Sequence, residues 1–279
     1  MYSLKIQNAS GDIFELTHNP AYAIIGVQGV TTPAISINTS VCGLFDGEFF
    51  NSARMGMRNI VIDIVVCGDI ETNRKELYHI FSIKKPCTIY FENVNRSVKI
   101  EGYVEVIDGD LFTMRQQMQV SIICPQPYWQ GLYDIYGEIS TTMKRFAFPF
   151  SISEDAPVPI STVEDAPVLD IYNPGDVECG FVAQMTFSVS VAVPKIINTE
   201  TGEFIGIGYL MTTSASISTV SGNLYVKNSD GDDITGLLSQ GSTWFKLKPG
   251  HNLLTYSTDN STENKMTVSI TASPLYGGV

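Results

Sequence analysis

Side chains that carry out chemistry in proteins are few in this chain of 279 residues, and none of them completes a known site. The histidines His18, His79 and His251 form no His-x-x-x-His pair of the kind that binds zinc. No Gly-x-Ser-x-Gly motif positions a serine nucleophile, and no glycine-rich phosphate loop is present. The sequence therefore predicts no catalytic, cofactor-binding or metal-binding residues, and no enzyme.

Two short motifs match ligand sites only in part. Gly206-Ile-Gly208 lacks the third glycine and the helix that dinucleotide binding requires. Asp230-Gly-Asp-Asp233 offers oxygen ligands for calcium, but it lacks the remaining spaced carboxylates and the bidentate glutamate of a calcium loop. We interpret it as a polar hairpin turn.

The two tryptophans, Trp129 and Trp244, leave other roles open. Sugar rings stack on exposed aromatic faces, so Trp244 is the candidate residue for glycan stacking. Trp244 also fits a core position in a strand, with its neighbour Phe245 on the opposite face, and we favour the core interpretation. Trp129 follows two prolines and fits a cap over a first hydrophobic core.

The charge of the chain is strongly acidic, with 17 basic and 29 acidic residues and a net charge of −12. Residues 1–150 carry 12 basic and 15 acidic groups, whereas residues 151–279 carry 5 and 14. Proteins that bind the phosphate backbone of nucleic acids need a basic surface, so sequence-specific nucleic-acid binding is not expected. An acidic surface instead suits a channel through which a polyanion slides without sticking.

The five cysteines, Cys42, Cys67, Cys87, Cys124 and Cys179, are odd in number and widely spaced, which disfavours disulfides and zinc. No stretch is long and apolar enough for a membrane helix, and the first residues lack the order of a signal peptide. We therefore expect a protein without membrane insertion, soluble in the cytoplasm where it is made.

The first half of the chain shows several strand patterns. Residues 60–66 are almost continuously apolar, which predicts a strand covered on both faces. From Val98 to Val106 apolar and polar residues alternate, so one face, Val106 included, is expected to be buried. Two more strands are predicted at residues 88–92 and 116–124.

One helix is predicted, over residues 72–83. Leu77 and Phe81 recur there at helical spacing, and Asp69 or Thr72 can serve as the N-cap. The order strand, helix, strand, strand, strand indicates a mostly β domain with one covering helix.

Residues 151–169 differ in composition from the rest of the chain, because prolines and acidic residues cluster there. The pentapeptide Glu154–Val158 also recurs there, as Glu164–Val168. We interpret this segment as a proline-stiffened linker. The second half then shows only short strands separated by polar turns, which predicts an antiparallel sandwich. These strands are expected at residues 181–193, 204–211, 217–220, 224–227, 244–247, 253–256 and 266–271, with a hairpin turn at 198–202.

Several of these segments, taken together and in order, resemble phage distal tail proteins, the Dit family. The resemblance is carried by residues 59–67, 74–81, 86–90, the corner Cys124-Pro-Gln-Pro-Tyr-Trp129, the turn Asn173-Pro-Gly175, the hairpin 198–203 and residues 245–252. It implies a mainly β fold with an N-terminal ring-forming tail domain (1–150), a linker (151–169) and a galectin-like β-sandwich (170–279).

The resemblance implies a structural virion protein of a long non-contractile tail. Six copies would form a ring at the distal tail end, where they would join the tail tube and the tape-measure end to the tail-associated and receptor-binding proteins. A six-membered ring needs two different complementary surfaces on each subunit.

Two other functions stay open at this point. The C-terminal sandwich is an alternative carbohydrate-binding module that recognises host surface glycans, with Trp244 as the stacking platform. A hydrolase acting on cell-wall polymers needs only two suitably separated carboxylates, which the sequence alone does not exclude.

Overall fold

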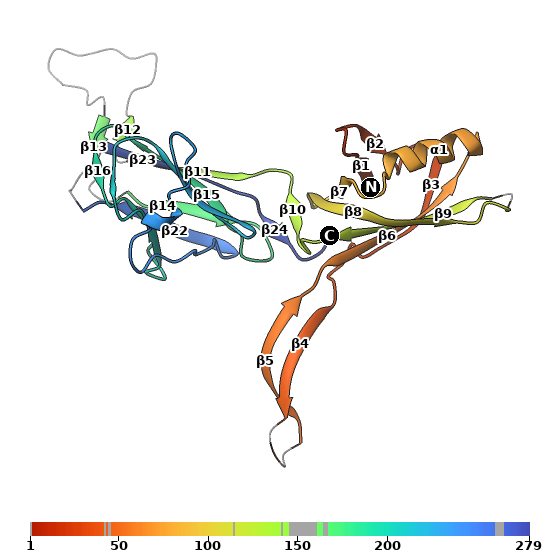
Figure 1. The fold of residues 1–279 in the computed structure, drawn as a ribbon, viewed down its shortest axis with the longest axis horizontal. Helices are drawn as coiled ribbons and strands as arrows, with labels where there is room; N and C mark the ends of the chain where they lie inside the picture. Colours follow the sequence, from red (N-terminus) through yellow and green to blue (C-terminus); the bar gives the residue numbers. More distant parts are fainter. Residues whose placement is uncertain are drawn as a thin grey trace. The chain divides into compact units, whose positions relative to one another are not determined.

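The computed structural model describes residues 2–41, 43, 46–113, 115–140, 142–144, 161–163, 167–259 and 265–279. The chain divides into two compact units, residues 1–132 with 275–279, and residues 133–274 (Figure 1). The second unit is thus an insertion in the first. Most of the predicted linker lies outside the described residues, and the predicted domain boundaries at 150 and 170 stay predictions.

The first unit is built on one large antiparallel sheet in the strand order β2-β1-β7-β8-β9-β6-β3. Two short strands, β10 (Trp129–Gly131) and β24 (Leu275–Tyr276), pair with each other, and β10 also pairs with β8. The main strands are β1 (Ser3–Gln7), β2 (Ile13–Glu15), β3 (Tyr22–Gln28), β6 (Arg58–Val66), β7 (Pro86–Glu92), β8 (Ser97–Gly109) and β9 (Gln117–Cys124).

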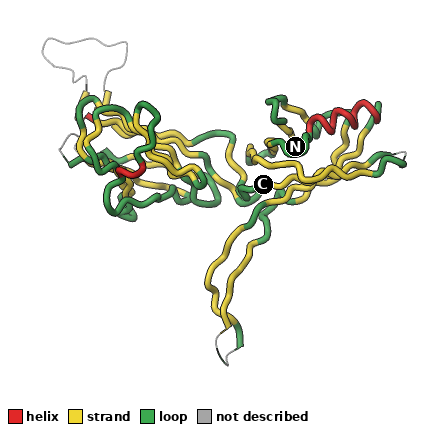
Figure 2. Tube along the Cα trace, viewed as in Figure 1, coloured by secondary structure: helices red, strands yellow, loops and turns green. Residues whose placement is uncertain are grey.

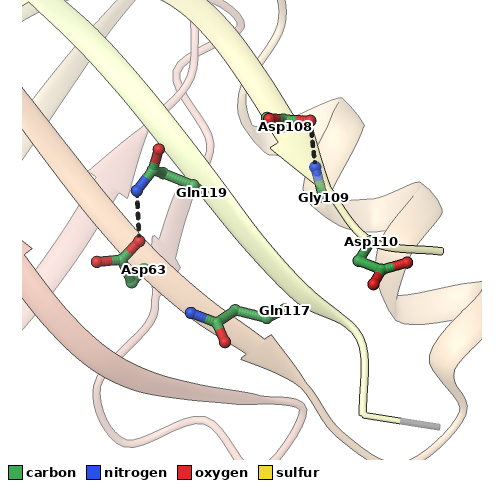
Figure 3. Close-up of a pocket in the computed structure, with 6 residues that line it drawn as sticks. All are labelled: Asp63, Asp108, Gly109, Asp110, Gln117 and Gln119. Atoms are coloured by element: carbon green, nitrogen blue, oxygen red, sulfur yellow. Dashed lines mark hydrogen bonds between the residues drawn. The ribbon is translucent and has the colours of Figure 1, made fainter. Parts of the chain in front are cut away.

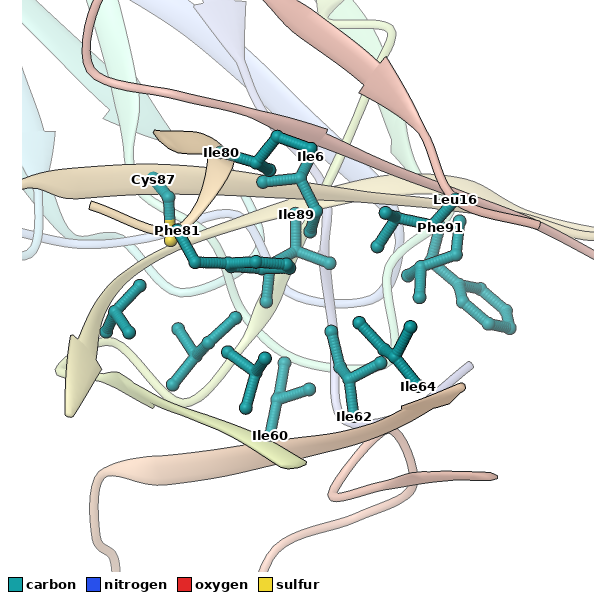
Figure 4. Close-up of a cluster of buried hydrophobic side chains, with 14 of the residues drawn as sticks. Ile6, Leu16, Ile60, Ile62, Ile64, Ile80, Phe81, Cys87, Ile89 and Phe91 are labelled. Atoms are coloured by element: carbon teal, nitrogen blue, oxygen red, sulfur yellow. The ribbon is translucent and has the colours of Figure 1, made fainter. Parts of the chain in front are cut away.

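The hydrophobic core of this unit lies on one face of the sheet (Figure 4). Alternate residues of β6, namely Ile60, Ile62 and Ile64, are fully buried there. They meet Ile89 of β7 and Phe81 beside the helix in the same cluster. Period-two burial of this kind is what fixes the register of each strand.

A single α-helix, α1 (Ile70–Ile80), lies over this face, as predicted (Figure 1). The side chain of Asp69 caps it by accepting bonds from the backbone nitrogen and the hydroxyl of Thr72. Leu77 and Ile80 are its buried residues. The helix ends at Ile80, earlier than the predicted residue 83.

Two details of the predicted strands are wrong. The strand at 60–66 is not covered on both faces, because Val61 and Asp63 on its second face are half-buried. Val106 is 47% exposed, because a β-bulge between Val104 and Val106 shifts the alternation of β8 by one residue.

A second feature of the first unit is a long hairpin of β4 (Ile35–Val41) and β5 (Glu48–Met55). These two strands pair only with each other and form a separate two-stranded sheet. Figure 2 shows both strands leaving the large sheet as a narrow arm. No prediction was made from the sequence for residues 35–55.

The second unit contains two main antiparallel sheets, ordered β11-β23-β15-β20-β21 and β14-β22-β17-β18, with the small pairs β12-β13 and β16-β19. Each main sheet buries one face, which makes a sandwich. The strands are β11 (Ile135–Ser140), β12 (Thr142–Lys144), β13 (Ser161–Val163), β14 (Leu169–Asn173), β15 (Phe181–Phe187), β16 (Val191–Ala192), β17 (Lys195–Asn198), β18 (Phe204–Gly206), β19 (Leu210–Met211), β20 (Ala215–Val220), β21 (Asn223–Asn228), β22 (Gly250–Ser257) and β23 (Met266–Ala272), with one 3-10 turn, η1 (Thr235–Leu237).

Two buried asparagines explain turns that carried the family resemblance. Asn173 donates to the carbonyls of Val177 and Leu247 at 3.2 and 3.0 Å. Asn252 donates to the carbonyl of Lys248 at 2.8 Å and accepts from its backbone nitrogen at 2.9 Å. These side chains replace backbone partners where the chain leaves the sheet, so their role is structural.

The predicted fold class is confirmed: the protein is mainly β, with antiparallel sheets and one covering helix. Three predicted strands of the second unit differ. The strand at 181–193 breaks after Phe187, and the strand at 204–211 is split into β18 and β19. Residues 244–247 form no strand, because among them only Leu247 makes a bridge, to Cys179. No helix within the described ranges has the length and hydropathy needed to cross a bilayer.

Candidate functional site

The exposed surface with the clearest chemical character is the arm formed by β4 and β5. Side chains alternate between its two faces, and cross-strand partners share a face. The register pairs Ile35 with Met55, Ile37 with Ala53 and Thr39 with Phe50. One face therefore carries mostly apolar side chains, and we call it the apolar arm face: Ile35, Ile37, Val41, Phe50, Ala53 and Met55. Thr39 and Glu48 lie on the same face, where Thr39 donates a hydrogen bond to Glu48, and Phe49 lies on the opposite face.

The apolar arm face is open to solvent in the single chain. Ile37 is 63% exposed, Phe50 65% and Val41 74%. The opposite face carries mainly polar side chains, and Ser40 bonds to Asn51 there at 3.3 Å. An isolated two-stranded ribbon is only marginally stable in water, so an arm with one apolar face calls for a covering partner.

The edge of the large sheet is a second candidate contact surface. β3 is the last strand in the sheet order, and it pairs with β6 on one side. Its seven residues, Tyr22–Gln28, include no charged residue and no proline. Proteins usually protect an edge strand with such residues or with a bulge. β3 has an irregularity only between Ile24 and Gly26, so the rest of the strand is suited to pairing with a further strand.

The solvent face of the large sheet is polar and acidic (Figure 3). An open hollow of about 430 Å³ lies there, lined by Asp63 of β6, Gln117 and Gln119 of β9, and Asp108, Gly109 and Asp110 at the end of β8. Gln119 donates to Asp63 at 2.9 Å. Nearby, Ser121 donates to Glu105 at 3.0 Å.

The carboxylates of this face, Asp63, Glu105, Asp108 and Asp110, take part in none of the ion pairs among the described residues. They therefore leave an uncompensated negative charge on the sheet. No group of three histidine, cysteine or acidic side chains suited to a metal ion occurs in the part of the chain that the structure describes. The hollow offers hydrogen-bond acceptors and negative charge.

Trp244, the predicted stacking residue, lies in an extended segment next to β18 and is half-buried. Its neighbour Phe245 is buried and its ring lies 5.2 Å from that of Phe181. Trp244 therefore does not occupy the buried core position that the sequence favoured, and its glycan role stays a prediction. Trp129 is fully buried in the core of the first unit.

The remaining chemical candidates have local structural roles. His251 bonds through Nδ1 to Asp170 at 2.8 Å on the surface. In the turn at 228–233, Asn228 accepts from the backbone nitrogens of Asp230 and Asp232, at 3.0 and 2.9 Å. The polar turn predicted there is thus the arrangement found.

Three of the cysteines are buried, and their environment makes them unreactive. Burial raises the pKa of Cys87 to about 11 and that of Cys179 to about 11. For Cys124, burial and the nearby Cys87 thiol raise the pKa to about 12. Thiols of such high pKa carry almost no thiolate at neutral pH, so these three cysteines act as small hydrophobes. Cys42 lies outside the described residues.

Sequence reasoning missed the arm, although one signal was present. Ile35 and Ile37 alternate with Ser36 and Asn38, which is a strand pattern with one apolar face. The glycines Gly43 and Gly47 follow, as expected where a hairpin turns.

Comparison with known proteins places these features in context. Residues 174–272 match the family model of the siphovirus-type tail component, C-terminal domain. No curated protein sequence matches the chain.

Solved structures share the fold over the whole chain. One is the crystal structure of the Dit protein (gp 19.1) of phage SPP1, described as a paradigm of hub adsorption apparatus in phages that infect Gram-positive bacteria. Its sequence is 15% identical to this chain, and the TM-score is 0.67. The alignment covers 98% of this chain and 99% of that one.

Two structures of the phage p2 baseplate in its activated conformation, with Ca and with Sr, are each 8% identical. Their TM-scores are 0.54 and 0.52, and the alignments cover 100% and 97% of this chain and 100% and 98% of those chains. Residues 174–272 are thus similar to the siphovirus-type tail component, C-terminal domain, and the chain has the fold of the SPP1 Dit hub protein over 98% of its length.

Proposed function

We propose that this protein is a non-catalytic ring component at the distal end of a long non-contractile phage tail. Six copies form the ring, which joins the tail tube and the tape-measure end to the tail-associated and receptor-binding proteins. The family of the C-terminal domain and the fold shared with a phage hub protein support this proposal.

The observation that carries the proposal is the apolar arm face of β4 and β5. A cyclic ring uses head-to-tail contacts, so each subunit presents two different surfaces that complement each other. The arm supplies one surface, and the uncharged edge of β3 supplies the other. The partner that covers the arm is therefore a second copy of this chain.

The acidic solvent face of the large sheet fits the inner wall of such a ring. Asp63, Glu105, Asp108 and Asp110 repel phosphate groups, since like charges raise the energy of close approach. DNA then passes through the channel without sequence-specific binding.

Native mass spectrometry of the full chain tests the ring, with two charge variants on adjacent residues of β4. Ile37→Glu places a carboxylate in the apolar arm face, whereas Asn38→Glu places the same charge on the opposite face. We expect hexamers for the wild type and for Asn38→Glu. For Ile37→Glu we expect at least a tenfold higher concentration for assembly, with an unchanged circular dichroism spectrum.

Two results would contradict the proposal. One is a wild-type chain that stays monomeric at high concentration, also when the tail proteins are added. The other is equal assembly by the two variants, which would show that the apolar arm face is not the contact.

A second candidate function is glycan binding by the inserted unit. Trp244 is half-buried rather than packed in the core, and Tyr172 and Tyr209 are 56% and 60% exposed on the same unit. Exposed aromatic rings of this kind are the usual platforms for sugars. Ring formation and glycan binding are compatible in one protein.

A further inference from the structure

A buried arginine holds together three segments of the first unit that are far apart in the sequence. Arg58, the first residue of β6, is fully buried. Its Nε donates to the carbonyl of Pro127 at 2.7 Å, and Nη2 donates to the carbonyl of Gly277 at 2.6 Å. Nη1 donates to the carbonyls of Gly29 and Thr31, at 2.6 and 2.5 Å.

These bonds come from a charged group that has only neutral partners. The guanidinium of Arg58 also lies 5.6 Å from the centre of the Trp129 ring. Burying a charge is costly unless its donors are all used, and the planar fork of arginine provides several donors in fixed directions. Lysine has one nitrogen and cannot reach four carbonyls in three segments.

One of the three segments is the root of the arm. Residues 29–31 lead from the end of β3 toward β4, which begins at Ile35. The carbonyl of Val30 accepts from Nε1 of Trp129 at 3.2 Å and from the backbone nitrogen of Val279 at 3.3 Å. The root is thus bonded to the core and to the C-terminal tail.

The second segment is that tail, residues 275–279. Arg96 donates to the carbonyl of Gly278 at 2.5 Å, and its guanidinium lies 4.7 Å from the centre of the Tyr276 ring. A side chain on Gly278 would meet the backbone nitrogen of Thr32 at 3.1 Å, so the tail lies directly against the root of the arm. The third segment, at Pro127, precedes β10, which pairs with the tail.

We propose that Arg58 is a positioning residue and that, with the C-terminal tail, it forms a latch that fixes the root of the arm. The latch rests on the proposed function in one respect, since the arm is the surface offered to the next copy in the ring. It makes ring assembly depend on the last five residues of the chain, which lie more than 200 positions from the arm in sequence.

Hydrogen exchange on the full chain tests the latch without requiring a ring. In Gly278→Val, the new side chain presses on Thr32, whereas in Gly236→Val, which lies outside the latch, nothing is within 4 Å of the added Cβ. We expect exchange of the amides of residues 29–41 to rise at least tenfold in Gly278→Val and to stay within twofold of wild type in Gly236→Val. Amides of β8 and β9 report global stability and should change less than twofold in both.

Arg58→Lys is the second variant in the test. We expect the same local rise at residues 29–41 in this variant, together with weaker ring assembly. If Arg58→Lys does not fold, Gly278→Val, which keeps Arg58, decides the question. Unchanged exchange at residues 29–41 in Gly278→Val would overturn the latch, whether or not the wild type forms rings. A rise in exchange at residues 29–41 in Gly278→Val, when the wild type forms no rings, would support the latch and contradict the ring.

Discussion

Among the described glycines of the first unit, Gly29 is the one where an added Cβ would come closest to the backbone. Its φ is +81°, and a Cβ placed there would lie 1.9 Å from the carbonyl oxygen of Asn59. Both conditions exclude a side chain, because the left-handed region is strained for other residues and the backbone atoms cannot yield. The contact brings the carbonyl of Gly29 within reach of Arg58.

We predict that Gly29→Ala lowers the free energy of unfolding by more than about 3 kcal/mol. Gly11→Ala is the matched control, since φ at Gly11 is +94° and nothing lies within 4 Å of the added Cβ. That variant should lose only about 1 kcal/mol, from backbone strain alone. Urea unfolding measures both, and equal losses would show that the contact with Asn59 is unimportant.

Single residues were the hardest level to predict from the sequence. Arg58 reads as a surface residue beside an apolar strand, because the four carbonyls that bind it come from residues 29, 31, 127 and 277. Trp129 follows the prolines that end β9, a position that fits a cap over the first core, and it is buried there. Trp244 was assigned to a strand on alternation alone, which does not show whether the backbone finds partners.

At the scale of elements, α1 shows how a local signal sets a boundary. The carboxylate of Asp69 accepts from the backbone and the hydroxyl of Thr72, and these bonds lower the pKa of Asp69 from 3.8. A lowered folded pKa means that the cap stabilises the protein above about pH 3.8 and that this stabilisation is lost as the pH falls through the folded pKa.

We predict that Asp69→Ala lowers the melting temperature at pH 7, since the first turn loses its acceptor. Asp69→Asn keeps an acceptor, so its melting temperature at pH 7 should lie between those of the wild type and Asp69→Ala. It should also lose less stability on acidification than the wild type does. Thermal melts followed by circular dichroism across the acid range measure this. If Asp69→Ala melts at the wild-type temperature, the cap contributes nothing to stability.

The elements around α1 were predictable because each carries its own pattern. The order β6, α1, β7, β8, β9 follows from alternation, helical spacing and the breaks between them. The arm was not predicted, because its apolar residues face solvent in the single chain and its pattern contains many serines and asparagines. Apolar residues that another molecule covers lie outside the chain's own hydrophobic core. Their pattern in the sequence therefore does not point to a core.

At the scale of the whole molecule, the second candidate function is open to a direct test. Exposed aromatics of the inserted unit are candidates for sugar contact, and Trp244 is the residue named by the sequence. A glycan array probed with the full chain tests this function. We predict that binding to any glycan detected there falls at least tenfold in Trp244→Ala.

Tyr209→Ala removes a second candidate ring on the same unit, which is 60% exposed, and should retain binding if Trp244 is the platform. Loss in Tyr209→Ala alone would place the platform at Tyr209 rather than Trp244. An array without any ligand for the wild type would remove this function and leave the ring as the sole proposal.

The mainly β class and the antiparallel sandwich of the second half were predictable from composition and short alternating strands. The insertion was not, because β24 is only two residues long and its pairing with β10 joins positions 129 and 276. Short strands of this kind have no period from which to infer a partner.

The pairing of β10 with β24 places the exit from the first unit and the return to it on neighbouring strands, about 5 Å apart. Any compact module whose own ends lie side by side fits between those two strands without disturbing the sheet that carries them. Recombination at these two short boundaries therefore exchanges the inserted part and leaves the large sheet of the first unit intact.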